Sequence, residues 1–303
     1  MSGARRCAII LVLALAPPAA VDAEVLAWTS TPGDFGGPRL ELVDLETGQS
    51  VEIGGYGLPD AAAGPLALDP SGTLFGIDSA QQRLLVLDPA TGAATVIGGL
   101  GVPLFQVFGF TADACGRLWL TGSPTSVPAA KFLYEIETAT GQATLGTPLS
   151  LAVYGLTARG DELFGLIYGE EARVVRIDPR SGVVSDLLPI DALTQVVPCA
   201  LDRDPGGDLW TSGAVLIPID PLPSAIVRIA PDGTAAATHA GYFYYAGLAI
   251  ARPEGLCGSG SPPAIPAASP VGLAVLAIAL AGAAIWVRRR SPGPRPGPGL
   301  RPN

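Results

Sequence analysis

The sequence predicts an all-β fold, a five-bladed β-propeller that is closed by its C-terminal strand and followed by a transmembrane helix. Three observations predict the propeller: Gly and Pro are frequent, one hairpin pattern recurs five times, and the two ends of the repeat array are complementary. The chain has 303 residues with 39 Gly and 30 Pro, and 49% of its residues are hydrophobic. So many helix-breaking residues exclude a helical bundle, and the apolar fraction excludes an intrinsically disordered chain.

The recurring hairpin consists of an alternating strand, a polar turn that ends in Gly, and a second strand. Gly is needed in the turn because a tight hairpin turn demands positive φ. A short strand with an aromatic residue recurs in phase, about every 45 residues. The turn glycines are Gly48, Gly92, Gly141, Gly182 and Gly233, and the aromatic residues are Trp28, Phe75, Trp119, Phe164 and Trp210.

Each repeat also contains a strand of small and apolar residues, so it has four strands, the size of a propeller blade. Small residues suit this strand because the blades converge at the axis. The first repeat begins at Val25 and lacks its innermost strand, while residues 247–250 form such a strand without a blade of their own. The two deficits cancel if the chain closes into a ring, which removes exposed sheet edges. A β-sandwich is the alternative, but it explains neither the period nor the complementary ends.

The turns before the aromatic strands carry a family resemblance. Three of them read DPSGTLF, DACGRLW and DPGGDLW. They resemble the NHL and quinoprotein-like propellers, in which a turn of the type D-x-x-G-x-L-[WF] precedes an aromatic strand. The resemblance implies the fold alone, because such folds host lactonases, lyases, dehydrogenases and binding modules.

Residues 1–23 have the features of a secretory signal peptide. Arg5 and Arg6 precede an apolar stretch over 7–16, and small residues stand before a cleavage site after Ala23. The apolar stretch is too short to span a membrane. We therefore expect export, with the propeller over 24–258 outside the cytoplasm.

The C-terminal part predicts a membrane anchor. A Pro-, Ser- and Gly-rich linker over 259–270 precedes an uncharged apolar stretch over 271–287, and a basic, Pro- and Gly-rich tail covers 288–303. At 1.5 Å per residue the apolar stretch forms a helix about 26 Å long, close to the thickness of the hydrocarbon core. The arginines after it favour a cytoplasmic tail. We expect a transmembrane helix that holds the propeller at the cell envelope.

This region also carries a second resemblance. Ile-Pro and Ser ahead of the apolar stretch, Gly at its start and an Arg cluster after it resemble the IPTL-type C-terminal protein-sorting signals of Gram-negative bacteria. Those signals are relatives of the PEP-type signals, so the resemblance implies an exosortase-like processing enzyme as a partner. Ala267 and Ala268 stand where Thr and Leu are usual. The matching residues are Ile265, Pro266, Ser269, Gly272, Arg288, Arg289 and Arg290.

The charge of the exported part restricts its partners. Residues 24–258 hold 26 acidic and 11 basic side chains, a net charge of 11 − 26 = −15. Such a domain repels nucleic acid and anionic lipid. We expect no nucleic acid among its partners.

Aromatic residues gather in the loops that precede the innermost strands. One interpretation is an aromatic mouth that stacks on sugars or apolar groups of an unknown extracellular ligand. The other is that the rings fill a narrow channel as core. The candidate residues are Tyr56, Phe105, Gln106, Tyr154, Tyr242, Phe243 and Tyr244.

Chemistry beyond binding has few candidates in this sequence. Asp202, Asp204 and Asp208 lie within seven residues and would suit calcium, but aspartates commonly cap such turns, so we expect no cofactor. The single histidine, His239, lies in an outer strand without an obvious partner. Gluconolactonase-like propellers hold their metal with Glu, Asn and Asp, and the one Asn of this chain is Asn303.

The cysteines allow at most one disulfide outside the cytoplasm, because Cys7 lies in the signal peptide and three others remain. Cys199 reads as a small buried apolar residue. Cys115 and Cys257 occupy the same turn position in two repeats, and a bond between them would fix the closing strand.

The sequence thus favours an exported, membrane-anchored β-propeller that binds or scaffolds a ligand at the bacterial cell envelope. The alternative is a secreted carboxylate-dependent enzyme, a glycosidase or a lyase, with its site in the mouth. No spacing of acidic residues singles out a catalytic pair.

Overall fold

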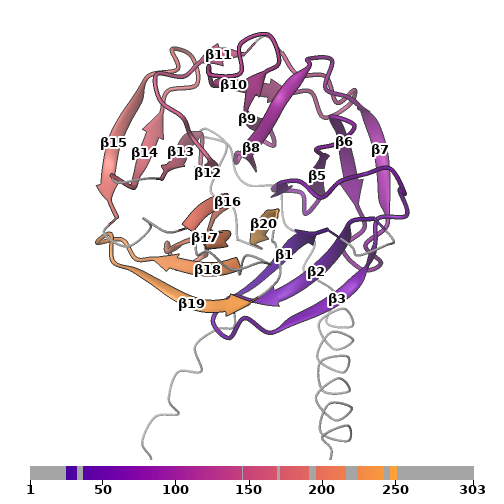
Figure 1. Ribbon diagram of the computed structural model, residues 1–303, viewed down its shortest axis with the longest axis horizontal. Coiled ribbons are helices and arrows are strands. Elements are labelled where there is room, and N and C mark those ends of the chain that lie inside the picture. The colour runs from indigo at the N-terminus through magenta and orange to yellow at the C-terminus, as the bar shows by residue number, and fades with distance from the viewer. Residues whose placement is uncertain are drawn as a thin grey trace, which may run out of the picture.

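The fold is a ring of five four-stranded antiparallel sheets, so the predicted five-bladed propeller is confirmed (Figure 1). The computed structural model describes residues 25–32, 37–144, 146–168, 171–190, 196–215, 224–241 and 246–250. No helix within these ranges is long and apolar enough to cross a membrane. The predicted signal peptide, linker, transmembrane helix, sorting motif and tail lie outside the described residues.

Each blade has four strands, and the first-named strand of a blade is its innermost. Blade 1 contains β20 (Gly247–Ile250), β1 (Leu26–Thr31), β2 (Arg39–Asp44) and β3 (Ser50–Gly55); blade 2 contains β4 (Leu66–Leu68), β5 (Leu74–Asp78), β6 (Arg83–Leu87) and β7 (Ala94–Gly99). Blade 3 contains β8 (Leu104–Ala112), β9 (Leu118–Pro124), β10 (Phe132–Ile136) and β11 (Thr147–Pro148); blade 4 contains β12 (Gly155–Arg159), β13 (Glu162–Ile167), β14 (Arg173–Ile177) and β15 (Val184–Pro189). Blade 5 contains β16 (Val196–Arg203), β17 (Leu209–Val215), β18 (Ser224–Ile229) and β19 (Ala235–Gly241).

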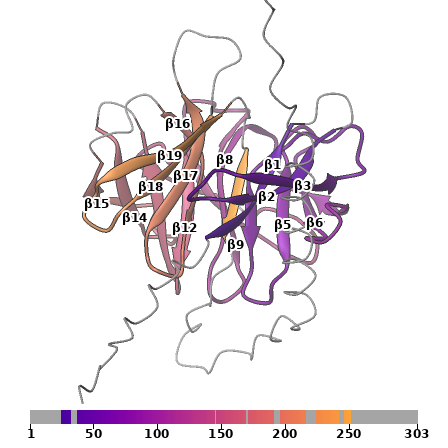
Figure 2. The same cartoon turned by 90° about the horizontal axis from the view of Figure 1, so that it is seen from below.

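The C-terminal strand closes the ring as predicted. β20 lies beside β1 in the ring (Figures 1 and 2) and pairs with it antiparallel. In this pairing Trp28 lies opposite Ala249. A buried carboxylate reinforces this closure: Asp202 on β16 accepts hydrogen bonds from the backbone N–H of Ile250 at 2.7 Å and from Thr157 Oγ1 at 3.0 Å. One side chain therefore joins blade 5 to blade 4 and to the closing strand.

The core lies between neighbouring blades. Trp210 of blade 5 is fully buried in one cluster with Ala27, Leu248 and Ile250 of blade 1. Near the axis the innermost strands approach closely, because a Cβ on Gly109 would lie 2.7 Å from the Cβ of Leu156 on the next blade. The expectation that small residues belong in the innermost strands is confirmed.

Glycine pairs on the outer strands have a different role. A Cβ on Gly98 of β7 would overlap the carbonyl oxygen of Thr140 in the next blade, and one on Gly54 of β3 would overlap that of Thr91. The turn of each of these hairpins therefore rests on the outer strand of the preceding blade, backbone against backbone. The repeated Gly-Gly permits this contact, which the sequence pattern did not predict.

The predicted hairpin turns are confirmed by their backbone conformation. Gly48, Gly92, Gly141, Gly182 and Gly233 all have positive φ, between 69° and 88°. Aspartates stabilise three of the turns that precede the aromatic strands, through Asp69, Asp113 and Asp204. Asp113 Oδ1 accepts the backbone N–H groups of Cys115 at 2.9 Å and Arg117 at 3.0 Å, and its Oδ2 accepts the indole N–H of Trp119 at 3.0 Å.

Candidate functional site

Three partly exposed aromatic rings pack together where blades 3 and 4 meet. Phe108 on β8 lies edge-to-face with Tyr154, which precedes β12, at a centroid distance of 5.1 Å. Tyr154 lies edge-to-face with Tyr168, which follows β13, at 4.6 Å. We call Phe108, Tyr154 and Tyr168 the aromatic cluster. It lies at the end of the propeller where the innermost strands begin.

A lysine completes this cluster on one side. The ammonium of Lys131 lies 4.7 Å from the ring centroid of Phe108 and donates a hydrogen bond to Ser123 Oγ at 2.7 Å. Burial raises the pKa of the Tyr154 hydroxyl, and the neighbouring Tyr168 raises it further. Tyr154 is therefore protonated at neutral pH, and its hydroxyl can both donate and accept hydrogen bonds.

Irregular pairing of β8 with β9 places Phe108. The register shifts between Leu104 and Gln106 and again between Val107 and Phe110. Inside the second irregularity, the N–H of Gly109 binds Thr121 Oγ1 at 2.8 Å. Bulges re-aim side chains and are frequent beside functional sites. The one signal in the sequence was Gly109, because a lone Gly in a strand often marks a bulge.

A glutamine holds the start of the same strand. Gln82 has φ 52°, and its Oε1 accepts the N–H of Leu104 at 2.9 Å while its Nε2 donates to the Leu104 carbonyl oxygen. The amide thus pairs with both backbone groups of Leu104. The next residue, Phe105, is 60% exposed, so an anchored strand presents an apolar ring to solvent.

The predicted mouth residues divide into three groups. Tyr154 belongs to the aromatic cluster, and Phe105 and Gln106 are exposed on the same strand as Phe108. Tyr56 is 2% exposed and packs in the core between blades 1 and 2, where burial raises its pKa. Tyr56 therefore fits the other interpretation, in which the ring is part of the core. The remaining candidates lie outside the described residues, namely Tyr242, Phe243 and Tyr244.

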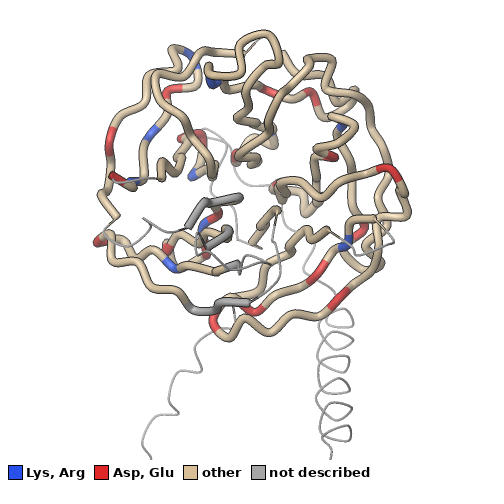
Figure 3. Tube along the Cα trace, in the orientation of Figure 1, with Lys and Arg blue, Asp and Glu red and all other residues tan. Residues whose placement is uncertain are grey.

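The three aspartates considered for calcium point to different partners. Asp202 accepts the hydrogen bonds at the ring closure, and Asp204 accepts the indole N–H of Trp210 at 2.8 Å. Asp208 accepts a hydrogen bond from Arg228 at 2.6 Å. Across the described ranges, no three His, Cys, Asp or Glu side chains are grouped to hold a metal ion. Acidic residues are instead spread around the ring (Figure 3).

Cys115 lies in the turn between β8 and β9 and is disulfide-bonded. The side chain of its partner cysteine is not among those that the structure describes. The pairing with Cys257 remains a prediction.

Comparisons with known proteins found similarity among solved structures. No family model and no curated protein matches the chain. A gluconolactonase from Xanthomonas campestris is similar at 14% identity, over 75% of this chain and 83% of the other, with a TM-score of 0.46. The virginiamycin B lyase from Staphylococcus aureus is similar at 15% identity, over 70% and 83%, with a TM-score of 0.41. A nidogen/laminin complex contains a similar chain at 14% identity, over 76% and 99%, with a TM-score of 0.45.

Proposed function

We propose that this chain is an exported, membrane-anchored propeller that binds a carbohydrate at the bacterial cell envelope. The export and the anchor rest on the sequence of residues 1–23 and 271–287. The binding rests on one observation: the partly exposed aromatic cluster shares its end of the ring with the exposed Phe105.

The chemistry of this surface suits a sugar. Aromatic faces cover the C–H faces of sugar rings, while a few polar groups orient the ligand. Tyr154 and Tyr168 offer phenolic hydroxyls, and Gln106 offers an exposed amide on the strand that carries Phe108. The fixed start of β8 reduces the conformational entropy that binding would cost.

Three of the buried carboxylates have structural partners that argue against their use as a catalytic pair. Asp78, which is fully buried, accepts the N–H of Ala62 at 2.9 Å and pairs with Arg83 at 2.8 Å. Asp113 and Asp204 accept bonds from their own turns and from indole N–H groups. These acids stabilise turns. A glycosidase or lyase acting through a carboxylate pair remains the second candidate.

A glycan array tests the proposal with the full-length chain in a non-ionic detergent. We expect saturable binding to a bacterial polysaccharide or peptidoglycan fragment. Phe105→Ala should weaken it at least about fivefold, the effect of removing about 1 kcal/mol of contact. Leu187→Ala is the matched control, because Leu187 is 55% exposed on β15, away from the cluster.

Two results would contradict the proposal. One is the absence of binding to any fragment, and the other is equal affinity of the Phe105→Ala and Leu187→Ala variants. Mass spectrometry of the bound fragments after long incubation separates the two candidate functions. Cleaved or unsaturated products would favour the enzyme.

A further inference from the structure

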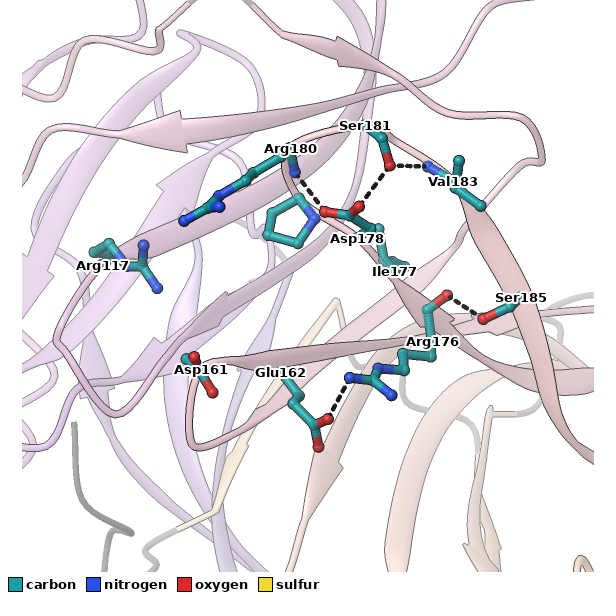
Figure 4. A pocket seen from close by; sticks show the side chains of 11 residues that line it. Arg117, Asp161, Glu162, Arg176, Ile177, Asp178, Arg180, Ser181, Val183 and Ser185 are labelled. Carbon is teal, nitrogen blue, oxygen red and sulfur yellow. Dashed lines mark hydrogen bonds and ion pairs between the residues drawn. The ribbon is translucent and has the colours of Figure 1, made fainter. Parts of the chain in front are cut away.

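An open groove lies at the opposite end of blades 3 and 4 from the aromatic cluster. Its volume is about 730 Å³. Its walls are the β8–β9 turn, the β12–β13 turn, and the β14–β15 turn with the adjoining strand ends (Figure 4). The cluster lies where the innermost strands begin, and these turns lie where the same strands end, so the groove is a separate feature.

Arg117 projects into the groove from blade 3 in a fixed orientation. Its Nε donates to Asp113 Oδ2 at 2.7 Å, and its guanidinium carbon lies 5.3 Å from the ring centroid of Trp119. The indole N–H of Trp119 binds the same carboxylate oxygen. The side chain is nevertheless 42% exposed. The carboxylate and the ring therefore hold the guanidinium in place, while its terminal N–H groups remain available to the groove.

Arg180 enters the groove from blade 4. Its turn is fixed, because Asp178 accepts the backbone N–H of Arg180 at 2.9 Å and the hydroxyl of Ser181 at 2.7 Å. Within the described part of the chain, the Arg180 guanidinium has no hydrogen-bonded or ion-paired partner. Figure 4 shows it extending toward Arg117. Two guanidinium groups from different blades thus approach one another across a hollow.

Further charged side chains line the groove besides Arg117 and Arg180. Arg176 forms an ion pair with Glu162 at 2.6 Å, and Arg117 forms one with Asp113 at 2.7 Å through its Nε. Within the described ranges, Arg180 is the arginine of the groove without such a pair. The carboxylate of Asp178 accepts a backbone N–H and a hydroxyl of its own turn and attracts the Arg180 guanidinium without forming an ion pair with it. Asp161 also lines the groove and is exposed. Its negative charge opposes an anion without neutralising either arginine in an ion pair.

We propose that this groove binds an oxyanion, a carboxylate or phosphate group, between Arg117 and Arg180. A guanidinium presents N–H donors in a planar fork that matches both kinds of group. An anion between the two side chains also replaces the repulsion of like charges by attraction on both sides. The exported domain has a net charge of −15 and repels anions as a whole. The pair of arginines would attract an anion locally despite this repulsion.

Calorimetric titration of the full-length chain tests this site with two probes, tripolyphosphate and trigalacturonate. We expect saturable binding of at least one probe, with an affinity about tenfold lower in Arg180→Gln. The difference in affinity between the variant and the wild type should be smaller at high salt, because salt screens the charges. Arg159→Gln is the matched control, since Arg159 is an exposed arginine of the same blade outside this groove. Asp161→Asn should strengthen binding, because it removes a repulsive charge.

The probe that binds with the higher affinity identifies the kind of anion, a phosphate for tripolyphosphate or a uronate-type carboxylate for trigalacturonate. The proposal is overturned if neither probe saturates at millimolar concentration. It is also overturned if Arg180→Gln binds as tightly as the Arg159→Gln control. Arg180→Gln should unfold at nearly the same temperature as the wild type, because the Arg180 side chain is exposed and forms no hydrogen bond or ion pair within the described ranges.

Discussion

The carboxylate of Asp202 should decide how firmly the ring is closed. It is 4% exposed and accepts bonds from Thr157 Oγ1 at 3.0 Å, the N–H of Arg203 at 2.8 Å and the N–H of Ile250 at 2.7 Å. Asp202→Ala removes the acceptor of these donors, which belong to blades 4, 5 and 1. The Ile250 N–H is then buried without this acceptor.

The size of the effect follows from the three bonds. Hydrogen bonds to a charged group contribute about 1.5–3 kcal/mol each, a gross loss of about 4.5–9 kcal/mol. The variant no longer has to bury a charge, which offsets part of this loss. We expect the free energy of unfolding to fall by about 3 kcal/mol. For a domain of this size, that lowers Tm by about 6–12 °C.

Thermal unfolding followed by tryptophan fluorescence measures the total loss, and hydrogen exchange locates it. The amides of β1 and β20 should exchange faster in Asp202→Ala than in the wild type. The control is Asp186→Ala, because Asp186 pairs with Arg173 at 2.6 Å but is 69% exposed. Surface pairs of this kind contribute about 0–1 kcal/mol. Equal stability of the two variants, or unchanged exchange in β1 and β20, would refute this account of closure.

Three further predictions concern the contacts between and within blades. In urea unfolding, Gly98→Ala should lower the free energy of unfolding by about 1–3 kcal/mol, because the added Cβ overlaps a backbone carbonyl of the next blade. Gly99→Ala is the control, because a Cβ at Gly99 has no atom within 4 Å, and it should change the free energy of unfolding by less than about 0.5 kcal/mol. Trp119→Phe should cost about 1–2 kcal/mol in the same assay through the lost indole hydrogen bond, and an unchanged midpoint would contradict that role. The Ser181 hydroxyl and a backbone N–H lower the pKa of Asp178, so its contribution to stability is complete above the unfolded pKa of about 3.9 and is lost as pH falls through the folded value. In thermal unfolding between about pH 5 and 2, Asp178→Asn should therefore lose slightly less Tm on acidification than the wild type, and an equal or larger loss would contradict this role.

The blades and their closure were predictable because they depend on the backbone pattern. A turn glycine with positive φ and an aromatic strand recur with the period of the blade, and neither signal depends on how side chains pack. The first repeat, from Val25, lacked an innermost strand, and the last strand, up to Ile250, lacked a blade. The antiparallel pairing of β20 with β1 supplies both. The D-x-x-G-x-L-W pattern also has a local cause, the bond from the Trp119 indole to Asp113.

The aromatic cluster was predictable only in part. Tyr154 was among the candidates, but Phe108 and Tyr168 were missed. Phe108 meets Tyr154 from the neighbouring blade, and Tyr168 meets it from the end of β13 in the same blade. The alternation of side chains along a strand fails at the bulges of β8, so the direction of Phe108 could not be derived from its position. Tyr56 shows the reverse problem: it occupies a similar place in the chain and turns into the core.

The position of each proposed site decides which variants can separate binding from folding. Phe105 and Arg180 are held by the backbone next to them, and their side chains are not part of the described contacts that join the blades. Truncating either should therefore change binding at unchanged Tm. Arg117 differs, because its guanidinium shares the Asp113 carboxylate with Trp119 and so serves both the groove and the turn. A loss of anion binding in an Arg117 variant would support the groove only alongside a stable Arg180→Gln variant that loses it too.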